Sequence, residues 1–303
     1  MDTRTSPTVA AETTAWSPPL PAAPGFEHFI VQTPGVRRHV AAIGAGEPVV
    51  LLHGFPAHWW QWHAIAPILA AHGYRVICPD LRGSGWTHAD DPAFHRETQL
   101  GDVLAVLDAM GIDRAHVMAH DMGAISAMQL AYGHPERVRA MVQLAVPPGF
   151  MEFSPKVIPA FRHMPRLLAH RPPTSMRYLF NPAYQQRPFT DEEVTAYLAP
   201  EERPEVLDAV HRLYRGMVIP VSLQLMRGDF KRRRLQPPTL FVFGREDRPF
   251  TEEVVRRISR HRGRRAERTE LAFVENAAHF LPEDAPEAVA ALAIEWFRSS
   301  ASA

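Results

Sequence analysis

Asp121 stands where a strand pattern changes into a helix pattern within a single residue. Residues 115–119 predict an apolar strand, and the apolar spacing of residues 122–132 predicts a helix. Two small residues, Ala119 and Gly123, flank the turn, as a sharp strand-to-helix connection requires. Such a turn exposes the carboxylate and aims the first free N–H groups of the helix at the atom it attacks. A carboxylate nucleophile forms an ester with an alkyl carbon, so the pattern favours epoxide opening or halide displacement over ester hydrolysis.

An aspartate at this position can also act simply as the N-cap of the following helix. Two further residues favour the chemical interpretation. Asp247 follows an apolar strand pattern at residues 239–244, and His279 lies in the loop after another at residues 270–274. Open α/β sheets bind ligands at the carboxyl ends of their strands, so the three side chains are expected to meet there. Because the chain has sixteen histidines, His279 becomes a candidate base only through this shared placement.

A second turn supplies hydrogen-bond donors for the same site. The apolar run at residues 49–52 ends in a His-Gly-Phe-Pro turn that presents the Phe55 N–H group. Together with the Met122 N–H group it forms a predicted two-donor oxyanion hole. Trp59 and Trp60 follow this turn and are candidate residues of the substrate pocket, with packing of their helix in the core as the alternative.

The elements that must position these residues alternate between strands and helices. Two strands joined at residues 33–35 come first, and short apolar runs then alternate with apolar-periodic helices. This rhythm predicts an α/β fold with a mostly parallel central sheet flanked by helices. Proline-punctuated helical segments then predict an inserted helical cap, with helices at residues 191–198 and 205–217. The expected organisation is a flexible N-terminal tail at 1–24, a first core segment at 25–147, the cap at 148–236 and a second core segment at 237–303.

Composition argues against several classes of function. The 33 basic and 33 acidic residues cancel, so net charge favours neither nucleic acid nor an anionic membrane as a partner. The lone Cys78 excludes an intramolecular disulfide, and no apolar run approaches the length of a membrane span. The sequence contains no metal-binding motif and no nucleotide fingerprint, so neither a metal nor a cofactor is expected. The N-terminal composition lacks a signal-peptide pattern, which favours a cytoplasmic protein, and a homodimer is compatible with the sequence.

These motifs together resemble the α/β-hydrolase fold superfamily, and within it the aspartate-nucleophile branch of epoxide hydrolases and haloalkane or haloacetate dehalogenases. The resemblance runs from about Phe26 onward. It rests on five segments: His53-Gly54-Phe55-Pro56, Asp80-Leu81-Arg82-Gly83-Ser84-Gly85, His120-Asp121-Met122-Gly123, Gly244-Arg245-Glu246-Asp247 and the loop of His279. It implies a catalytic triad in which Asp121 is the nucleophile, Asp247 the acid and His279 the base.

The neighbours of the nucleophile discriminate within this branch. Haloalkane dehalogenases usually place a tryptophan directly after the nucleophile, and haloacetate dehalogenases carry arginines just after it, whereas this chain has Met122 and Ile125. Epoxide hydrolases carry tyrosines in the cap that protonate the departing alkoxide. Tyr214 resembles one of them, Tyr178 is the first candidate for its partner, and Tyr184 is the next.

The resemblance therefore implies an epoxide hydrolase that takes a small apolar epoxide and water. Dehalogenation of a haloalkane or haloacid by the same nucleophile is the first alternative, and a non-catalytic hydrolase-fold binding protein is the second. A serine-type esterase is disfavoured because the elbow position holds Asp121, while Ser126 falls within the following helix.

Overall fold

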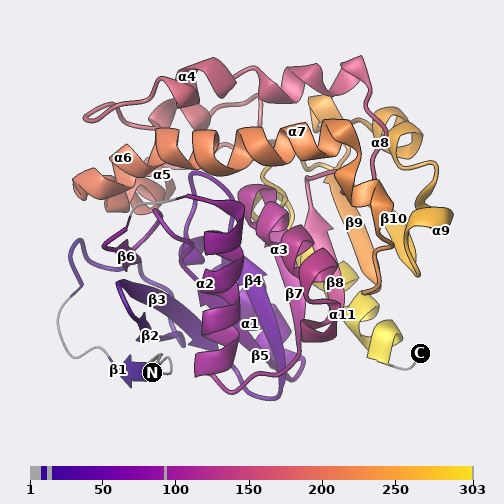
Figure 1. Cartoon of the computed structure of the whole chain (residues 1–303). Coiled ribbons are helices and arrows are strands. Elements are labelled where there is room, and N and C mark those ends of the chain that lie inside the picture. The colour runs from indigo at the N-terminus through magenta and orange to yellow at the C-terminus, as the bar shows by residue number, and fades with distance from the viewer. Residues whose placement is uncertain (1–7, 12–15, 92–93, 302–303) are drawn as a thin grey trace, which may run out of the picture.

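One mixed sheet forms the centre of the molecule, with helices on both of its faces (Figure 1). The computed structural model describes residues 8–11, 16–91 and 94–301 of the 303-residue chain. Within this part the strands are β1 Thr8–Ala11, β2 Glu27–Thr33, β3 Val36–Ile43, β4 Glu47–Leu52, β5 Tyr74–Pro79, β6 His88–Ala89, β7 Ala115–His120, β8 Val138–Leu144, β9 Thr239–Gly244 and β10 Thr269–Val274. They lie in the order β1-β2-β3-β5-β4-β7-β8-β9-β10, and β6 pairs with β3. The pairs β5-β4, β4-β7, β7-β8, β8-β9 and β9-β10 are all parallel, which confirms the predicted mostly parallel α/β sheet.

Continuous apolar runs place the parallel strands at the centre, since both faces of such strands are covered. Leu51 and Leu52 of β4 are both fully buried, on opposite faces of the sheet. Helices α1 (Ile65–Ala71) and α11 (Pro286–Ala301) pack on one face, in the same apolar cluster as Leu51. Helices α2 (Arg96–Ala109), α3 (Asp121–Gly133) and α8 (Glu252–Ile258) cover the other, in the cluster of Leu52.

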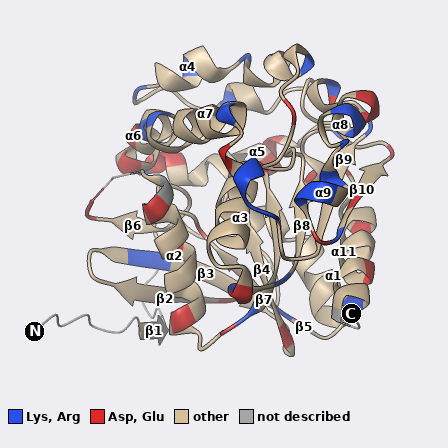
Figure 2. Ribbon diagram, turned by 45° about the vertical axis from the view of Figure 1, so that its right-hand side comes forward, with Lys and Arg blue, Asp and Glu red and all other residues tan. Residues whose placement is uncertain are grey.

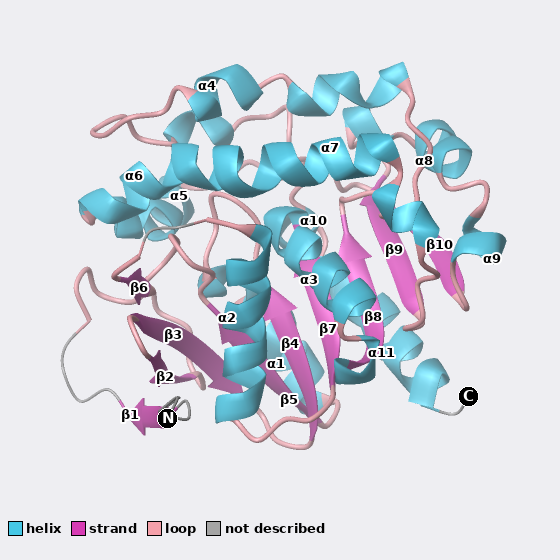
Figure 3. Ribbon diagram, viewed as in Figure 1, coloured by secondary structure: helices cyan, strands magenta, loops and turns pink. Residues whose placement is uncertain are grey.

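The segment between β8 and β9 forms a helical layer over the carboxyl ends of the parallel strands (Figure 3). Its main helices are η3 Pro155–Phe161, α4 Met164–Leu168, α5 Asp191–Leu198, α6 Pro204–Leu213 and α7 Ile219–Arg227. The predicted helix at residues 205–217 does not end where expected. It passes through a π-helical turn at Tyr214–Val218 and continues into α7. Such turns insert one residue into a helix and recur at functional sites.

The N-terminal region differs from the flexible tail expected at residues 1–24. Residues 8–11 form β1, which pairs antiparallel with β2. Further along, the Trp86 indole donates a hydrogen bond to the Pro18 carbonyl at 2.6 Å, and the Trp60 indole donates one to the Ala22 carbonyl at 3.2 Å. The tail prediction did not anticipate these contacts of residues 8–11, Pro18 and Ala22, and residues 1–7 and 12–15 of the predicted tail lie outside the described residues. The helices of the predicted cap all fall between Pro155 and Arg232.

Acidic and basic residues both occur throughout the fold, on the helices beside the sheet and in the helical layer above it (Figure 2). Several of the basic residues pair with carboxylates on the same helix, for example Arg256 with Glu252 and Arg257 with Glu253 on α8. Among the described residues, no helix is both long enough and apolar enough to cross a membrane.

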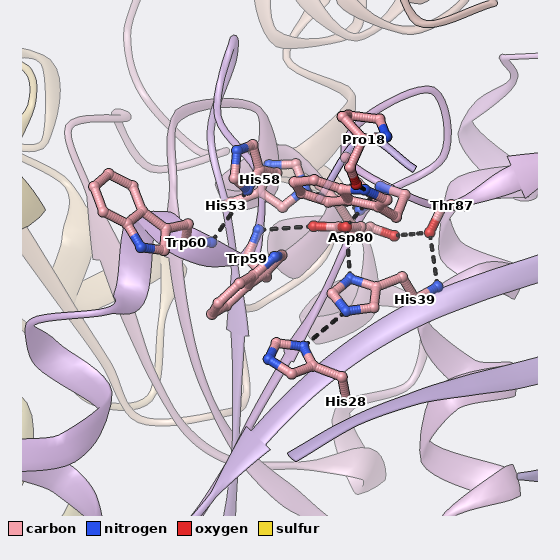
Figure 4. Close-up of polar contacts among 12 residues, drawn as sticks. Pro18, His28, His39, His53, His58, Trp59, Trp60, Asp80 and Thr87 are labelled. Atoms are coloured by element: carbon pink, nitrogen blue, oxygen red, sulfur yellow. Dashed lines mark hydrogen bonds and ion pairs between the residues drawn. The ribbon is translucent and has the colours of Figure 1, made fainter. Parts of the chain in front are cut away.

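A buried carboxylate, Asp80, joins the antiparallel edge of the sheet to the parallel centre (Figure 4). It is 1% exposed. Its Oδ1 accepts from the Trp59 N–H at 2.7 Å, and its Oδ2 accepts from the Trp86 N–H at 2.9 Å and contacts His39 Nδ1 at 2.7 Å. Burial opposes ionisation, but charge attraction and hydrogen bonding from His39 lower the pKa of Asp80 to about 2.

We predict that Asp80→Asn lowers the free energy of unfolding by about 3 kcal/mol, because an amide leaves buried donors of this network without an acceptor. Urea denaturation followed by circular dichroism measures the loss. The lowered pKa contributes stability above about pH 3.8, and this contribution disappears as the pH falls through about 2. Asp208→Asn, which changes an exposed carboxylate paired with Arg212 on the same helix, is the control. Equal losses in the two variants would contradict the assignment.

Candidate active site

Asp121 occupies a strained turn between β7 and α3. Its φ angle of 46° lies in the left-handed region, which non-glycine residues rarely adopt. The turn also requires close contact with β4, because a Cβ on Gly123 would lie 2.2 Å from the Leu52 carbonyl oxygen. The Asp121 Oδ2 accepts from the Phe55 N–H at 2.9 Å, across the site from its own helix. The carboxylate therefore projects into the site as an elbow nucleophile would, and not back onto α3 as an N-cap.

Three loops at the carboxyl ends of β7, β9 and β10 bring Asp121, Asp247 and His279 together, as the sequence predicts. His279 Nδ1 lies 3.2 Å from Asp247 Oδ2, and His279 Nε2 lies 3.8 Å from Asp121 Oδ1. The Asp247 side chain is 2% exposed, whereas Asp121 keeps 25% of its side chain exposed. The buried carboxylate is thus placed to orient the imidazole, and the accessible one is placed to meet a ligand.

Charge interactions set the protonation state of this group. Burial disfavours a charged His279, but interactions with Asp121 and Asp247 outweigh it and raise the pKa of His279 to about 10. Burial also opposes ionisation of Asp121, yet His279 and the Phe55 N–H hold its pKa below the usual range. These interactions favour the protonated form of His279 at neutral pH. Removal of the negative charge of Asp121 would lower the pKa of His279.

A cavity of about 200 Å³ lies above the Asp121 carboxylate. Its polar lining groups are few: Asp121, Asp247, His279, His163, Tyr184, Tyr214 and Ser222. The rest of the lining is apolar and comes from both the sheet side and the helical layer, including Phe55, Met122, Met128, Met151, Leu167, Val221 and Phe280. A mostly apolar cavity with a few convergent polar groups is the usual form of a small-molecule site.

The cap tyrosines differ in where they lie. Tyr214 is 9% exposed, lines the cavity and packs edge-on against Phe55, and burial raises its pKa well above the usual range. Tyr184 also lines the cavity, with its ring 6.0 Å from that of His279, and its hydroxyl accepts from Arg162 Nε at 3.2 Å. Tyr178 does not line the cavity. The Arg166 guanidinium covers its ring at 3.4 Å, and its buried hydroxyl makes no hydrogen bond to the described residues.

Trp59 and Trp60 do not line the cavity, which corrects their expected place in the substrate pocket. Trp59 is fully buried, donates its backbone N–H to Asp80 and packs its ring 5.3 Å from Phe26. Trp60 stacks on His63 at 4.1 Å. The short helix after the oxyanion turn directs both indoles into the apolar core, and this packing was the alternative interpretation.

A buried hydrogen-bond chain connects the oxyanion turn to the base, and sequence reasoning missed it. The Gly54 N–H donates to Gln61 Oε1 at 2.8 Å, and Gln61 Nε2 lies 3.2 Å from His120 Nδ1. His120 Nε2 in turn lies 2.8 Å from the His279 carbonyl oxygen. Burial lowers the pKa of His120 to about 4, so a neutral His120 donates through Nε2 and accepts through Nδ1. Only the proximity of His120 to the nucleophile could have indicated such a role; Gln61 carries no signal in the sequence.

Comparison with known proteins identifies the family of the chain. Residues 47–286 match the family described as alpha/beta hydrolase fold. The chain belongs to this family. The alpha/beta hydrolase fold explains why Asp121, Asp247 and His279 lie together at the carboxyl ends of β7, β9 and β10.

Several relatives within the alpha/beta hydrolase fold are named epoxide hydrolases. A soluble epoxide hydrolase of Corynebacterium sp. (strain C12) is 27% identical over 295 residues, which cover 89% of this chain and 96% of that protein. Epoxide hydrolase 2 of Siraitia grosvenorii is 41% identical over 123 residues, 40% of this chain and 39% of its own length. That match thus spans about two fifths of the curated relative. A solved epoxide hydrolase of Vigna radiata superposes with a TM-score of 0.74 at 26% identity, covering 92% of this chain and 99% of that one.

The described residues contain no group of three or more His, Cys, Asp or Glu side chains placed to hold a metal ion. The histidines near the cavity have other partners. His279 contacts the two carboxylates, and His120 contacts Gln61 and a backbone carbonyl. The polar side chains that line the cavity carry carboxylate, imidazole, phenol and hydroxyl groups.

We predict that His279 titrates near pH 10 in the free protein and that Asp121→Ala lowers this pKa, because one of its two anionic neighbours is lost. NMR of isotopically labelled histidine measures both values, and His279→Gln identifies the signal. The raised pKa contributes stability that is complete below about pH 6.5 and is lost as the pH rises through about 10. An unchanged titration in Asp121→Ala would show that Asp121 does not control the base.

Proposed function

We propose that this protein is an epoxide hydrolase that converts a small apolar epoxide and water into a vicinal diol. One observation carries the proposal: an aspartate on a strained elbow faces an apolar cavity that Tyr214 and Tyr184 also line, with His279 beside it. An ester-forming carboxylate, phenolic proton donors and a base are the groups that a two-step epoxide hydrolysis needs. The relatives named epoxide hydrolases support the same conclusion.

In the first step the Asp121 carboxylate attacks one epoxide carbon and the carbon–oxygen bond of the ring breaks. The electron pair of that bond goes to the ring oxygen, which takes a proton from a cavity tyrosine. Burial raises the pKa of both Tyr214 and Tyr184, which keeps them protonated before the reaction. The products of this step are an alkyl ester on Asp121 and a neighbouring hydroxyl group.

In the second step water hydrolyses the ester. Esterification removes the negative charge of Asp121, so the pKa of His279 falls, and the ring gives its proton to the tyrosinate left by ring opening and becomes a base. His279, oriented by Asp247, takes a proton from water, and the hydroxide attacks the ester carbonyl carbon of Asp121. The Phe55 N–H already contacts this carboxyl group at 2.9 Å and stabilises the oxyanion, with the Met122 N–H as the second donor. As the intermediate collapses, its bond to the substrate oxygen breaks and the departing alkoxide takes a proton from His279 to complete the diol. The carboxylic acid left on Asp121 then returns a proton to His279, which restores the carboxylate and the imidazolium.

The lining of the cavity favours an epoxide over a halide. A departing halide needs no proton but is held by N–H donors, whereas a departing alkoxide needs an acid. Here phenols line the cavity, and the side chains of Met122 and Ile125 near the nucleophile are apolar. A binding protein without catalysis has no need for a strained nucleophile aligned with an acid and a base.

We assign the second proton donor to Tyr184 in place of Tyr178, which was the first candidate from sequence. Tyr184 lines the cavity beside His279, and the guanidinium of Arg162 stabilises negative charge that develops on its hydroxyl oxygen. Tyr178 lies outside the lining, with its ring under Arg166. The first proton donor is Tyr214, which lies in the π-helical turn between α6 and α7.

We predict that His279→Gln still opens an epoxide but does not hydrolyse the resulting ester, because the nucleophile remains while the base is lost. After incubation with a panel of terminal and internal epoxides, intact-protein mass spectrometry should show an adduct equal in mass to the substrate. Peptide mapping should place it on Asp121. Asp121→Ala is the control and should form no adduct. Rapid diol formation by Asp121→Ala would refute the aspartate nucleophile, and halide release from haloalkanes without any epoxide turnover would establish the dehalogenase alternative.

We predict that Tyr214→Phe and Tyr184→Phe each slow single-turnover alkylation by an epoxide by about 10²-fold, because the remaining tyrosine compensates in part for the lost proton donor. Tyr178→Phe is the matched control and should cause a smaller loss than either. Alkylation by a haloalkane, which needs no proton, should change little in all three variants. A larger effect from Tyr178→Phe than from Tyr184→Phe would return the second role to Tyr178.

A further inference from the structure

The cap segment that carries Tyr184 lies directly against the loop that carries His279. The Phe280 N–H, one residue after the base, donates to the Tyr184 carbonyl oxygen at 3.0 Å. This bond joins the backbone of the cap segment to that of the core loop at the site itself. The rings of Tyr184 and His279 are 6.0 Å apart.

A single carboxylate, that of Asp284, is hydrogen-bonded to both of these segments. Asp284 is the last residue of α10 (Leu281–Asp284). Its Oδ2 accepts from the Ala278 N–H at 2.9 Å, one residue before the base. Its Oδ1 accepts from the N–H groups of Gln186 at 2.9 Å and Arg187 at 3.0 Å, two and three residues after the cap tyrosine.

The two oxygens of Asp284 therefore serve different parts of the molecule. One binds the core loop and the other binds the cap. Asp284 is partly buried, and this burial raises the pKa of its carboxyl group, while the three N–H donors act in the opposite direction. An asparagine has one acceptor oxygen, so it satisfies either the core loop or the cap segment but not both.

We propose that Asp284 is a positioning residue that fixes the proton donor Tyr184 relative to the base His279. The inference rests on the proposed function, since it assigns Tyr184 to ring opening and His279 to ester hydrolysis. Asp284 acts through the backbone on either side of these residues and touches no reacting atom. Its loss should affect both half-reactions, because displacing a reacting group by about 1 Å can cost about 100-fold in rate.

The test is a double-mutant cycle on the rate of single-turnover alkylation by an epoxide. Asp284→Asn should slow alkylation by about 10-fold in the wild-type background. In Tyr184→Phe the same substitution should cost less than about 2-fold, because the donor it positions is already absent. Hydrolysis of the preformed ester should fall by about 10-fold in both backgrounds, since the bridge between the loop of His279 and the cap segment is broken in both. Asp208→Asn, an exposed carboxylate on α6, is the matched control and should change neither rate.

The cycle separates positioning from a general loss of stability. Equal effects of Asp284→Asn with and without the Tyr184 hydroxyl, or no effect on either step, would overturn the proposal. If Asp284→Asn does not fold, Asp284→Glu takes its place in the cycle, because it keeps two acceptor oxygens at an altered distance. Non-additivity with Tyr184→Phe is again the expected result, and additivity contradicts it. Failure of the wild-type protein to form any ester on Asp121 would instead refute the proposed function itself.

Discussion

The imidazolium of His279, held between two carboxylates, is the interaction on which the rest of the site depends. It keeps Asp121 ionised beneath an apolar cavity, although burial alone would favour the neutral acid. It also favours the protonated form of His279. In the proposed mechanism, this keeps His279 from acting as a base until Asp121 has formed the ester, so one electrostatic arrangement sets the order of the two steps.

Supporting contacts keep this arrangement at fixed geometry. The absence of a side chain on Gly123 lets α3 approach the carbonyl of Leu52, and Asp121 adopts its strained conformation in the same turn. The chain from Gly54 through Gln61 and His120 reaches the backbone of His279. Tight packing and saturated hydrogen bonds of this kind hold a strained residue in place.

Sequence reasoning recovered what local patterns determine. The helix at Asp191–Leu198 and the strand at Thr239–Gly244 have the expected bounds, and Asp121, Asp247 and His279 meet as expected. Patterns could not tell that Trp59 and Trp60 face the core, because an apolar ring suits a core and a pocket equally well. The choice between Tyr178 and Tyr184 depends on how irregular cap segments fold over the sheet. Gln61 and Asp284 each also contact a partner that is distant in sequence, His120 and Gln186 respectively, and no local pattern indicates such contacts.

For the proposed reaction, the apolar lining also bears on how the diol product leaves. An epoxide has one weakly hydrated oxygen, whereas a diol has two hydroxyl groups that each bind water strongly. Holding a diol in this cavity means removing that water with few polar groups to replace it, which is costly. The same walls that attract the reactant therefore disfavour the product. Conversion of the epoxide to the diol therefore weakens binding of the ligand to the cavity, and this weaker binding lowers product inhibition.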